Sequence, residues 1–230
     1  MNKLFAIVLC LAFFSSSAAK PKHKYVKIKT EMGECIIRLY NETPLHRDNF
    51  VKLAKKHTLD GRSFHRVIKN FMIQGGEKDL KGATAADSLA DRSADYTIPA
   101  EFRDSLFHKK GVLAAARDNN PEKASSGTQF YIVHGKVFDE EQLENVESTR
   151  MKFKIPEWQR VIYKTIGGVP HLDHNYTVYG EVVSGYDMVE KIANVQVNER
   201  DRPLKDIKMT VSLLKNRQVR KLEKSLKIAK

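Results

Sequence analysis

Short segments in which apolar and polar residues alternate recur along much of this 230-residue chain. A period of two places the apolar side chains on one face of a β-strand. Only two clear helices stand among them. One begins at Thr43-Pro44, with Thr43 as the expected N-cap, and ends near Asp60-Gly61; the other runs from Ser184 to Val195. The sequence therefore predicts a mainly β barrel or sandwich. The expected strands are Tyr25 to Thr30, Glu34 to Tyr40, two short strands within 63 to 76 that break at Lys69-Asn70, Lys110 to Ala116, Thr128 to His134, Thr177 to Val183 and Ile207 to Leu214.

The first nineteen residues have the layout of an export signal. Lys3 gives a positive start, Leu4 to Phe14 is apolar, and small residues end the segment at Ala19. The apolar run is shorter than the roughly 20 residues of a membrane span, although a core helix is an alternative. We expect an exported chain with no transmembrane segment after cleavage. A bacterial periplasm fits best, and another secretory compartment is the alternative. Its one remaining cysteine, Cys35, lies in a strand pattern and is expected to be buried and inert.

Residues 136 to 168 interrupt the strand pattern. From Lys136 to Lys164 the segment holds equal numbers of basic and acidic residues, and its composition favours helix. We interpret it as a helical surface insertion in the barrel rather than as a second domain. The chain then divides into a signal peptide (1–19), one domain (20–214) that contains the insertion, and a basic tail (215–230).

Positive charge is concentrated at the ends of the chain, whose formal net charge is +12. Residues 215–230 hold seven Lys or Arg residues against one Glu. Because no recognisable reading element accompanies this charge, we expect no specific nucleic-acid binding and only weak contact of the tail with anionic surfaces. Val219, Leu222 and Leu226 have helical spacing, and a frayed, solvated helix is favoured over an amphipathic tail that touches membrane or RNA.

Several kinds of chemistry lack their motifs here. The HLDH segment (171–174) offers two histidines and an aspartate, but a surface loop is favoured over a metal site. His65 has no evident nucleophile or carboxylate partner, so a packed strand histidine is favoured over a general base. Gly75-Gly76 lacks the Lys-Ser/Thr of a phosphate loop. We expect neither a metal nor another cofactor.

The segment SFHRVIKNFMIQGG (63–76) mixes types that seldom occur together. Arg66 is a permanently charged fork of hydrogen-bond donors. Strand alternation places Phe71 and Ile73 on one face and Met72 and Gln74 on the other. An arginine and an amide could thus border an apolar pocket, although periodicity alone favours an ordinary buried strand.

The motif FHRVIKNFMIQGG resembles the signature of the cyclophilin family of peptidyl-prolyl cis-trans isomerases. The segments KKGVLAAAR, ASSGTQFYIV and HLDHNYTVYGEVVSGYDMVEKI continue the resemblance in the same order, over most of residues 25 to 214. The resemblance implies a closed eight-stranded antiparallel β-barrel capped by two α-helices. It also implies rotation of X–Pro bonds in proline-containing unfolded or extended polypeptides, without cofactor. We expect a monomer.

The resemblance also implies roles for individual residues. Arg66 and Gln74 are the expected catalytic residues. His171 stands where many relatives have the tryptophan associated with cyclosporin binding, so weak cyclosporin sensitivity is expected. Changes at the groove's edge, at Arg117, Asp118 and His171, leave a second hypothesis open: a peptide- or partner-binding module with little turnover. The expected substrate contacts are Phe71, Met72, Ala116, Arg117, Asp118, Gln129, Phe130, Tyr131, His171, Leu172 and Tyr176, of which Tyr131 replaces a usual phenylalanine and Tyr176 a usual histidine.

Overall fold

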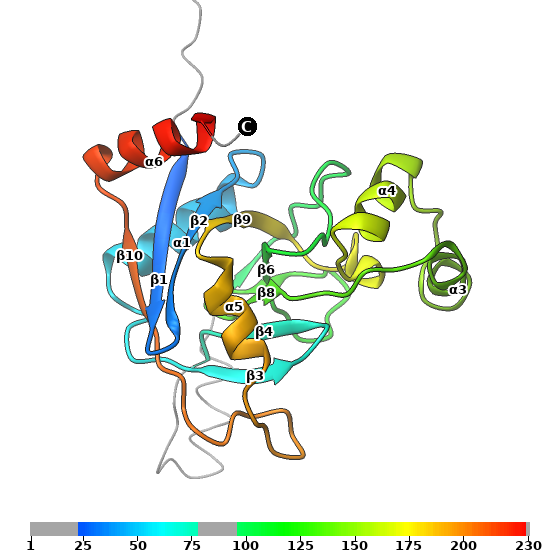
Figure 1. Cartoon of the computed structure of the whole chain (residues 1–230), viewed down its shortest axis with the longest axis horizontal. Helices are drawn as coiled ribbons and strands as arrows, with labels where there is room; N and C mark the ends of the chain where they lie inside the picture. The colour runs from blue at the N-terminus through cyan, green and yellow to red at the C-terminus, as the bar shows by residue number, and fades with distance from the viewer. Residues whose placement is uncertain (1–22, 78–95, 229–230) are drawn as a thin grey trace, which may run out of the picture.

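The computed structural model describes residues 23–77 and 96–228, and Figure 1 shows a curled sheet with helices around it. The expected signal peptide lies outside the described residues, as do residues 78–95. The strands are β1 (Lys24–Thr30), β2 (Gly33–Leu39), β3 (Phe64–Ile68), β4 (Met72–Gly75), β5 (Thr97–Ile98), β6 (Val112–Ala115), β7 (Ser125–Ser126), β8 (Phe130–Val133), β9 (Val178–Ser184) and β10 (Thr210–Leu213). The helices are α1 (Pro44–Lys55), α3 (Glu140–Arg150), α4 (Glu157–Thr165), the short 3-10 helix η1 (Pro170–Leu172), α5 (Tyr186–Ala193) and α6 (Asn216–Ile228).

Eight strands form one antiparallel sheet in the order β10-β1-β2-β9-β6-β8-β4-β3. Its two end strands are joined by backbone hydrogen bonds close to the strand ends. The Met209 amide donates to the Arg62 carbonyl at 2.8 Å, and the Phe64 amide donates to the Ile207 carbonyl at 3.0 Å. The predicted eight-stranded antiparallel fold is confirmed. The two-residue strands β5 and β7, which pair with each other, were not predicted.

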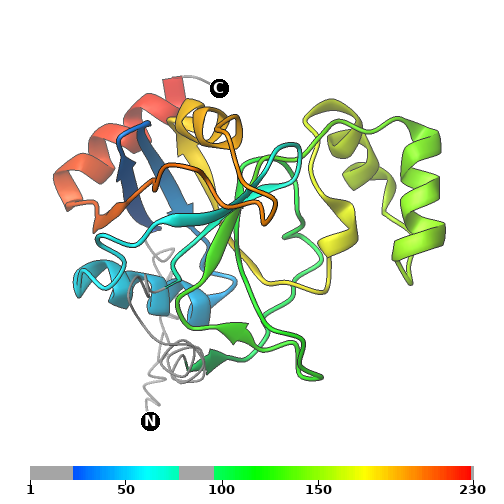
Figure 2. The ribbon, with the colours of Figure 1, turned by 90° about the horizontal axis from the view of Figure 1, so that it is seen from below.

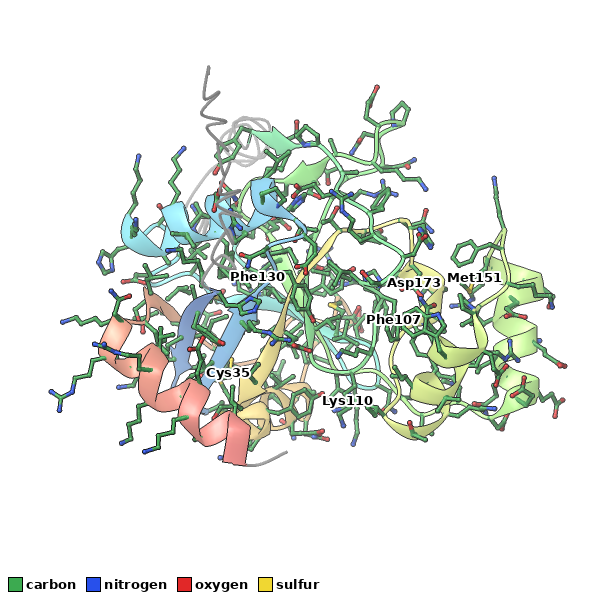
Figure 3. All side chains as sticks on the ribbon, turned by 90° about the horizontal axis from the view of Figure 1, so that it is seen from above. Cys35, Phe107, Lys110, Phe130, Met151 and Asp173 are labelled. Atoms are coloured by element: carbon green, nitrogen blue, oxygen red, sulfur yellow. The ribbon has the colours of Figure 1, made fainter. Side chains whose placement is uncertain are left out.

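The barrel interior holds the main apolar core. Cys35 and Phe130 are fully buried there, and both lie within the barrel in Figure 3. The expectation that Cys35 is buried is confirmed, and burial raises the pKa of its thiol to about 12, which disfavours the reactive thiolate. Helices α1 and α5 add Phe50, Leu53, Met188, Val189 and Ile192 to this core.

Helix α1 differs from its prediction at both ends. It begins at Pro44 as expected, but the Thr43 hydroxyl makes no capping bond. Instead the Glu101 carboxylate accepts hydrogen bonds from the amides of Leu45 (3.1 Å) and His46 (3.0 Å). Those amides have no partner inside the helix, so a distant acid satisfies them. The helix ends at Lys55 rather than near Asp60-Gly61, because the chain turns at His57, whose φ is +54°.

The predicted insertion forms α3 and α4, which project from one side of the barrel (Figure 2). Asp139 and Gln142 cap α3 reciprocally, as in a capping box. Phe138, Leu143 and Tyr163 of the insertion pack with Phe107 of the barrel in a separate small core. The insertion is therefore joined to the barrel by buried apolar contact and is not a free appendage.

The basic tail forms helix α6 beside β1 and β10 (Figure 1). Val219, Leu222 and Leu226 are half-buried, and the Tyr25 hydroxyl donates to Glu223 Oε1 at 3.2 Å. The expected freely solvated helix is thus wrong in one respect: its apolar side is partly covered. Across residues 23–77 and 96–228, no helix has the length and apolar content needed to cross a bilayer.

Candidate active site

A cavity of about 270 Å³ lies on the outer face of the sheet. Its lining consists entirely of residues singled out from the sequence: Arg66, Phe71, Met72, Gln74, Ala116, Arg117, Tyr131, Leu172 and Tyr176. A second apolar cluster, separate from the barrel core, forms its floor and includes Met72, Tyr131 and Ala116. The structure therefore brings nine candidates from four segments of the chain into one pocket.

Strand register explains how the central residues converge. Arg66 on β3 pairs with Gln74 on β4, and Gln74 pairs with Tyr131 on β8. Directly paired residues in antiparallel strands project from the same face of the sheet. Arg66, Gln74 and Tyr131 therefore form a row across the outer face, while Ile73 and Ile132 point into the core.

Phe71 departs from the simple alternation. It lies in the turn before β4, after Asn70 adopts a φ of +62°, and it does not continue the strand. Its ring packs on the outer cluster with Met72 rather than on the inner face with Ile73. The predicted shared face of Phe71 and Ile73 is thus wrong, because the turn rotates Phe71 to the cavity side.

The Arg66 guanidinium borders this apolar pocket and is partly exposed, with 43% of its side-chain surface accessible. Its Nε lies 3.5 Å from Asp201 Oδ2, and Asp201 is similarly exposed. An exposed pair at this distance contributes at most about 1 kcal/mol, so it orients the arginine without sequestering it. The Asp201 carbonyl accepts the Val67 amide at 2.8 Å, which fixes this loop against β3.

Gln74 joins the cavity to a neighbouring groove of about 350 Å³. Its Nε2 donates to Gln129 Oε1 at 3.2 Å. Gln129 and Asp118 line this groove rather than the cavity itself, together with His65. His65 is the packed strand histidine that was predicted: burial lowers its pKa, and Glu77 Oε2 lies 3.7 Å from its Nε2.

Arg117 and Tyr176 form one wall of the cavity. The Arg117 guanidinium lies 4.9 Å from the centroid of the Tyr176 ring, and its Nε donates to the Asn175 carbonyl at 2.8 Å. Tyr176 in turn meets Tyr131 edge to face, with the ring centroids 5.9 Å apart. Arg117 and Tyr176 both depart from the family pattern, and stacking and hydrogen bonding hold them together as one wall of the cavity.

Tyr131 belongs to a buried chain of hydrogen bonds that begins at the cavity. Its hydroxyl lies 2.8 Å from His108 Nε2, and His108 Nδ1 lies 2.7 Å from Asp173 Oδ1. Tyr163 of α4 donates to Asp173 Oδ2 at 2.6 Å. We call Tyr131, His108, Asp173 and Tyr163 the buried relay. All four are at most 4% exposed, so each bond is formed away from water.

The direction of these bonds follows from their partners. An ionised carboxylate only accepts, so the ring proton of His108 lies on Nδ1 and Nε2 accepts from Tyr131. Burial raises the pKa of Tyr131 and of Tyr163 well above the ordinary value, which keeps both phenols protonated as donors. The Tyr131 hydroxyl is consequently engaged with His108, and the ring supplies an apolar surface to the cavity, as a phenylalanine would.

Comparison with known proteins agrees with this geometry. The family model described as cyclophilin type peptidyl-prolyl cis-trans isomerase/CLD matches residues 25–212. A Staphylococcus aureus protein whose name assigns it to the peptidyl-prolyl cis-trans isomerases is 33% identical over 183 residues, which are 79% of this chain and 87% of that protein. The chain belongs to the cyclophilin family. It is, accordingly, a peptidyl-prolyl cis-trans isomerase, an enzyme.

Other relatives extend the comparison. A Staphylococcus saprophyticus protein with the same type of name is 33% identical over 179 residues, 77% of this chain and 85% of its own. The crystal structure of a Cryptosporidium parvum cyclophilin has a TM-score of 0.60 and 18% identity, covering 85% of this chain and 99% of that chain. At this identity the structural likeness supports the fold alone.

Two residues predicted to contact substrate lie elsewhere in this cyclophilin. Phe130 is fully buried inside the barrel and packs edge to face on Phe50 and Phe64, so it cannot hold a proline ring. Adjacent residues of a strand face opposite ways, which puts Tyr131 in the cavity and Phe130 in the core. His171 lies behind the cavity, where its ring stacks on Phe71 with centroids 5.7 Å apart.

The surface-loop interpretation of the HLDH segment is also wrong. Asp173 is 4% exposed and accepts hydrogen bonds from both the barrel and the insertion. Leu172 belongs to η1 and lines the cavity. Within the described residues no cluster of three or more His, Cys, Asp or Glu side chains is placed to hold a metal.

Sequence reasoning missed three residues that support the site. Asp201 reaches Arg66 from a loop 135 positions away, and His108 and Tyr163 complete the buried relay. None belongs to a recognisable motif. The only available signal was a tyrosine in place of the usual phenylalanine at 131, since a buried phenol needs a polar partner.

Proposed function

We propose that this cyclophilin accelerates X–Pro rotation in exported polypeptides during folding, with Arg66 stabilising the twisted amide directly. The carrying observation is the position of Arg66, whose guanidinium lies at the rim of an apolar cavity and whose ion pair with Asp201 is long and exposed. The proline ring would occupy the cavity above Met72 and Tyr131.

The chemistry follows from amide resonance. Rotation about an X–Pro bond meets a barrier of about 20 kcal/mol because the twisted bond loses its double-bond character. In the twisted state the proline nitrogen becomes pyramidal and gains a usable lone pair. A guanidinium N–H directed at that nitrogen forms a hydrogen bond that neither planar ground state offers. Arg66 would therefore stabilise the transition state selectively, as catalysis requires.

The mechanism requires that the proline ring be held still and that water be kept away from Arg66, and the surrounding residues support both. An apolar floor and the wall formed by Arg117 and Tyr176 would hold the ring while the preceding carbonyl swings. Exclusion of water by the bound ring would strengthen the attraction of the arginine. Gln74 donates to Gln129 and borders both the cavity and the neighbouring groove, so a role in binding the substrate backbone is favoured over a role in orienting Arg66. The mechanism needs neither proton transfer nor a covalent intermediate.

Export rests on the N-terminal segment. Residues 1–19 combine a basic start, an apolar stretch and small residues before the cleavage position. Proline isomerisation is a slow step in folding, so an exported isomerase would assist other exported chains, in a bacterial periplasm or another secretory compartment. Expression of the whole chain with residues 1–19 present or deleted, followed by fractionation and N-terminal sequencing, tests this part. Retention of residues 1–19 in the mature protein would contradict it.

The mechanism is tested by Arg66→Ala in an isomerase assay on a short proline peptide. We expect kcat/KM to fall about 100-fold to 1,000-fold, the usual cost of one preorganised transition-state donor. Arg220→Ala, an exposed arginine of α6, is the matched control and should keep full activity. Full activity of Arg66→Ala would overturn the mechanism. Tight peptide binding by the wild type with no rate enhancement would favour the binding-module hypothesis.

A further inference from the structure

A second cavity, of about 500 Å³, lies between the insertion and the barrel. We call it the insertion groove. One wall is formed by α3, and the other by the β3–β4 turn and η1. Phe71 lines both the insertion groove and the proposed proline cavity, and His171 stacks on it from the groove side. A single aromatic pair therefore separates the two spaces, and a chain leaving the cavity at this edge enters the groove.

The groove offers hydrogen-bonding side chains that have no partner among the described residues. Among the described residues, nothing bonds to the side chains of Asn70, Asn145 or Arg150, and all three are exposed. A side-chain amide both donates and accepts, so it matches the alternating N–H and C=O groups of an extended polypeptide backbone.

Charge in the insertion groove is balanced. Lys136 and Arg150 are offset by Asp139 and Glu141. Such a lining has no excess positive charge with which to attract nucleic acid or another polyanion. The lining fits a ligand that is polar but carries no net charge. For a peptidyl-prolyl isomerase, the backbone of its polypeptide substrate is such a ligand.

The insertion holds this wall in place before any ligand arrives. The buried relay ties Tyr163 of α4 to Tyr131 at the cavity floor. At the base of the insertion, the Gly168 amide donates to the Lys136 carbonyl at 2.9 Å. A Cβ on Gly168 would lie 2.2 Å from the His108 carbonyl, so the backbones meet too closely for a side chain. A preformed wall reduces the ordering cost of binding.

We propose that the insertion groove binds the extended polypeptide segment that flanks the target proline. This inference rests on the proposed function, because it assumes that the prolyl residue occupies the neighbouring cavity. It makes α3 a second peptide-contacting element that acts on KM through residues remote from the rotating bond.

The experiment compares a short proline peptide with two peptides that are lengthened on one side by about four residues, or roughly 13 Å of extended chain. In the wild type, one of the lengthened peptides should show a higher kcat/KM through a lower KM. The double variant Asn145→Ala/Arg150→Gln should lose about threefold to tenfold on that peptide, the range expected for one or two hydrogen bonds, and nothing on the short one. Glu144→Ala, exposed on the same helix and outside the groove lining, is the control.

The outcomes separate this inference from the proposed function. Activity on the short peptide with no gain from either extension overturns the groove proposal and leaves the isomerase intact. So does an equal loss on short and long peptides in the double variant. If no peptide is turned over, titration calorimetry decides: weaker binding of a lengthened peptide by the double variant supports the groove, and unchanged binding overturns it.

Discussion

At the scale of single residues, Tyr131 shows how the structure can accommodate a tyrosine where the family usually has a phenylalanine. A hydroxyl on the floor of an apolar pocket would disfavour a proline ring, but here it donates to His108. The surrounding protein thereby restores an apolar surface. The cost is that His108 now depends on that bond, because its Nε2 is buried and has no water to replace the phenol.

Replacement of Tyr131 by Phe should therefore lower stability more than activity. We expect the free energy of unfolding to fall by about 1–3 kcal/mol, the cost of an unsatisfied buried acceptor. Activity should stay within a few-fold of wild type, since the ring remains. Urea unfolding and an isomerase assay measure the two effects. Tyr176→Phe, which also lines the cavity, is the control and should unfold as wild type does; equal stability of both variants would refute the role of His108.

His171 provides a prediction for pH. Burial, and then the positive charge of Arg150 and the proximity of His108, lower its pKa to about 4, while Asp173 acts in the opposite direction. In the unfolded chain its pKa is about 6.5. Below that value the unfolded state binds the additional proton, so stability declines as pH falls from about 6.5 to about 4.

A His171→Gln variant should lose less stability than wild type over this interval. The measurement is the urea midpoint of both proteins at about pH 7.5 and about pH 4.5. His46 and His65 also have lowered pKa values and contribute to the decline in both proteins, so the informative quantity is the difference between them. Identical pH dependence in the two would mean that His171 is not protected from protonation in the fold.

At the scale of elements, the insertion is coupled to the sheet. Helix α4 reaches the cavity floor through the buried relay. Leu143 of α3 and Phe138, which precedes α3, pack into the small core beside Phe107, which Figure 3 labels close to Asp173. Hydrogen bonds in a chain polarise one another, so a change at one end of the relay should be felt at the other.

A double-mutant cycle tests this coupling. Tyr163→Phe removes the donor to Asp173, and Tyr131→Phe removes the donor to His108. We expect the double variant to differ from the sum of the single effects by more than about 0.5 kcal/mol in the free energy of unfolding. A cycle between Tyr131→Phe and Glu144→Ala should be additive. Additivity in both cycles would show that the insertion and the cavity are energetically independent.

At the scale of the whole molecule, the two additions to the barrel lie on different sides of it. The insertion projects from one side, and α6 lies at the other, in the views of Figures 1 and 2. The basic charge of α6 therefore does not surround the cavity. Its contact with β1, through Tyr25 and Glu223, makes it part of the domain's stability rather than of its chemistry.

Deletion of residues 215–230 should destabilise the domain and spare activity on short peptides. Loss of three half-buried aliphatic contacts, offset by the ordering of the helix, amounts to about 1–2 kcal/mol. That corresponds to a fall in Tm of roughly 2–8 °C for a domain of this size. Scanning calorimetry and the isomerase assay check both parts. An unchanged Tm would mean that α6 packs too weakly to matter.

The sequence by itself determined the strands, their two faces and the composition of the cavity. The strands and their faces follow from local alternation. The cavity residues, among them Arg66, Met72 and Gln74, could be named without coordinates because four segments of the chain resemble the family pattern. Even the exclusion of Phe130 was implicit in that alternation. Phe130 was nevertheless expected to contact the substrate, because the family resemblance matched Gln129 and Phe130 together as one motif.

The tertiary structure alone decided which distant groups complete each element. Glu101 caps α1 in place of Thr43, Asp201 approaches Arg66, and Asp173 is buried between barrel and insertion. In each case an unsatisfied polar group is paired with a partner far along the chain. Such pairings leave no periodicity, because the requirement to satisfy buried donors and acceptors is imposed by packing in space and not by spacing along the chain.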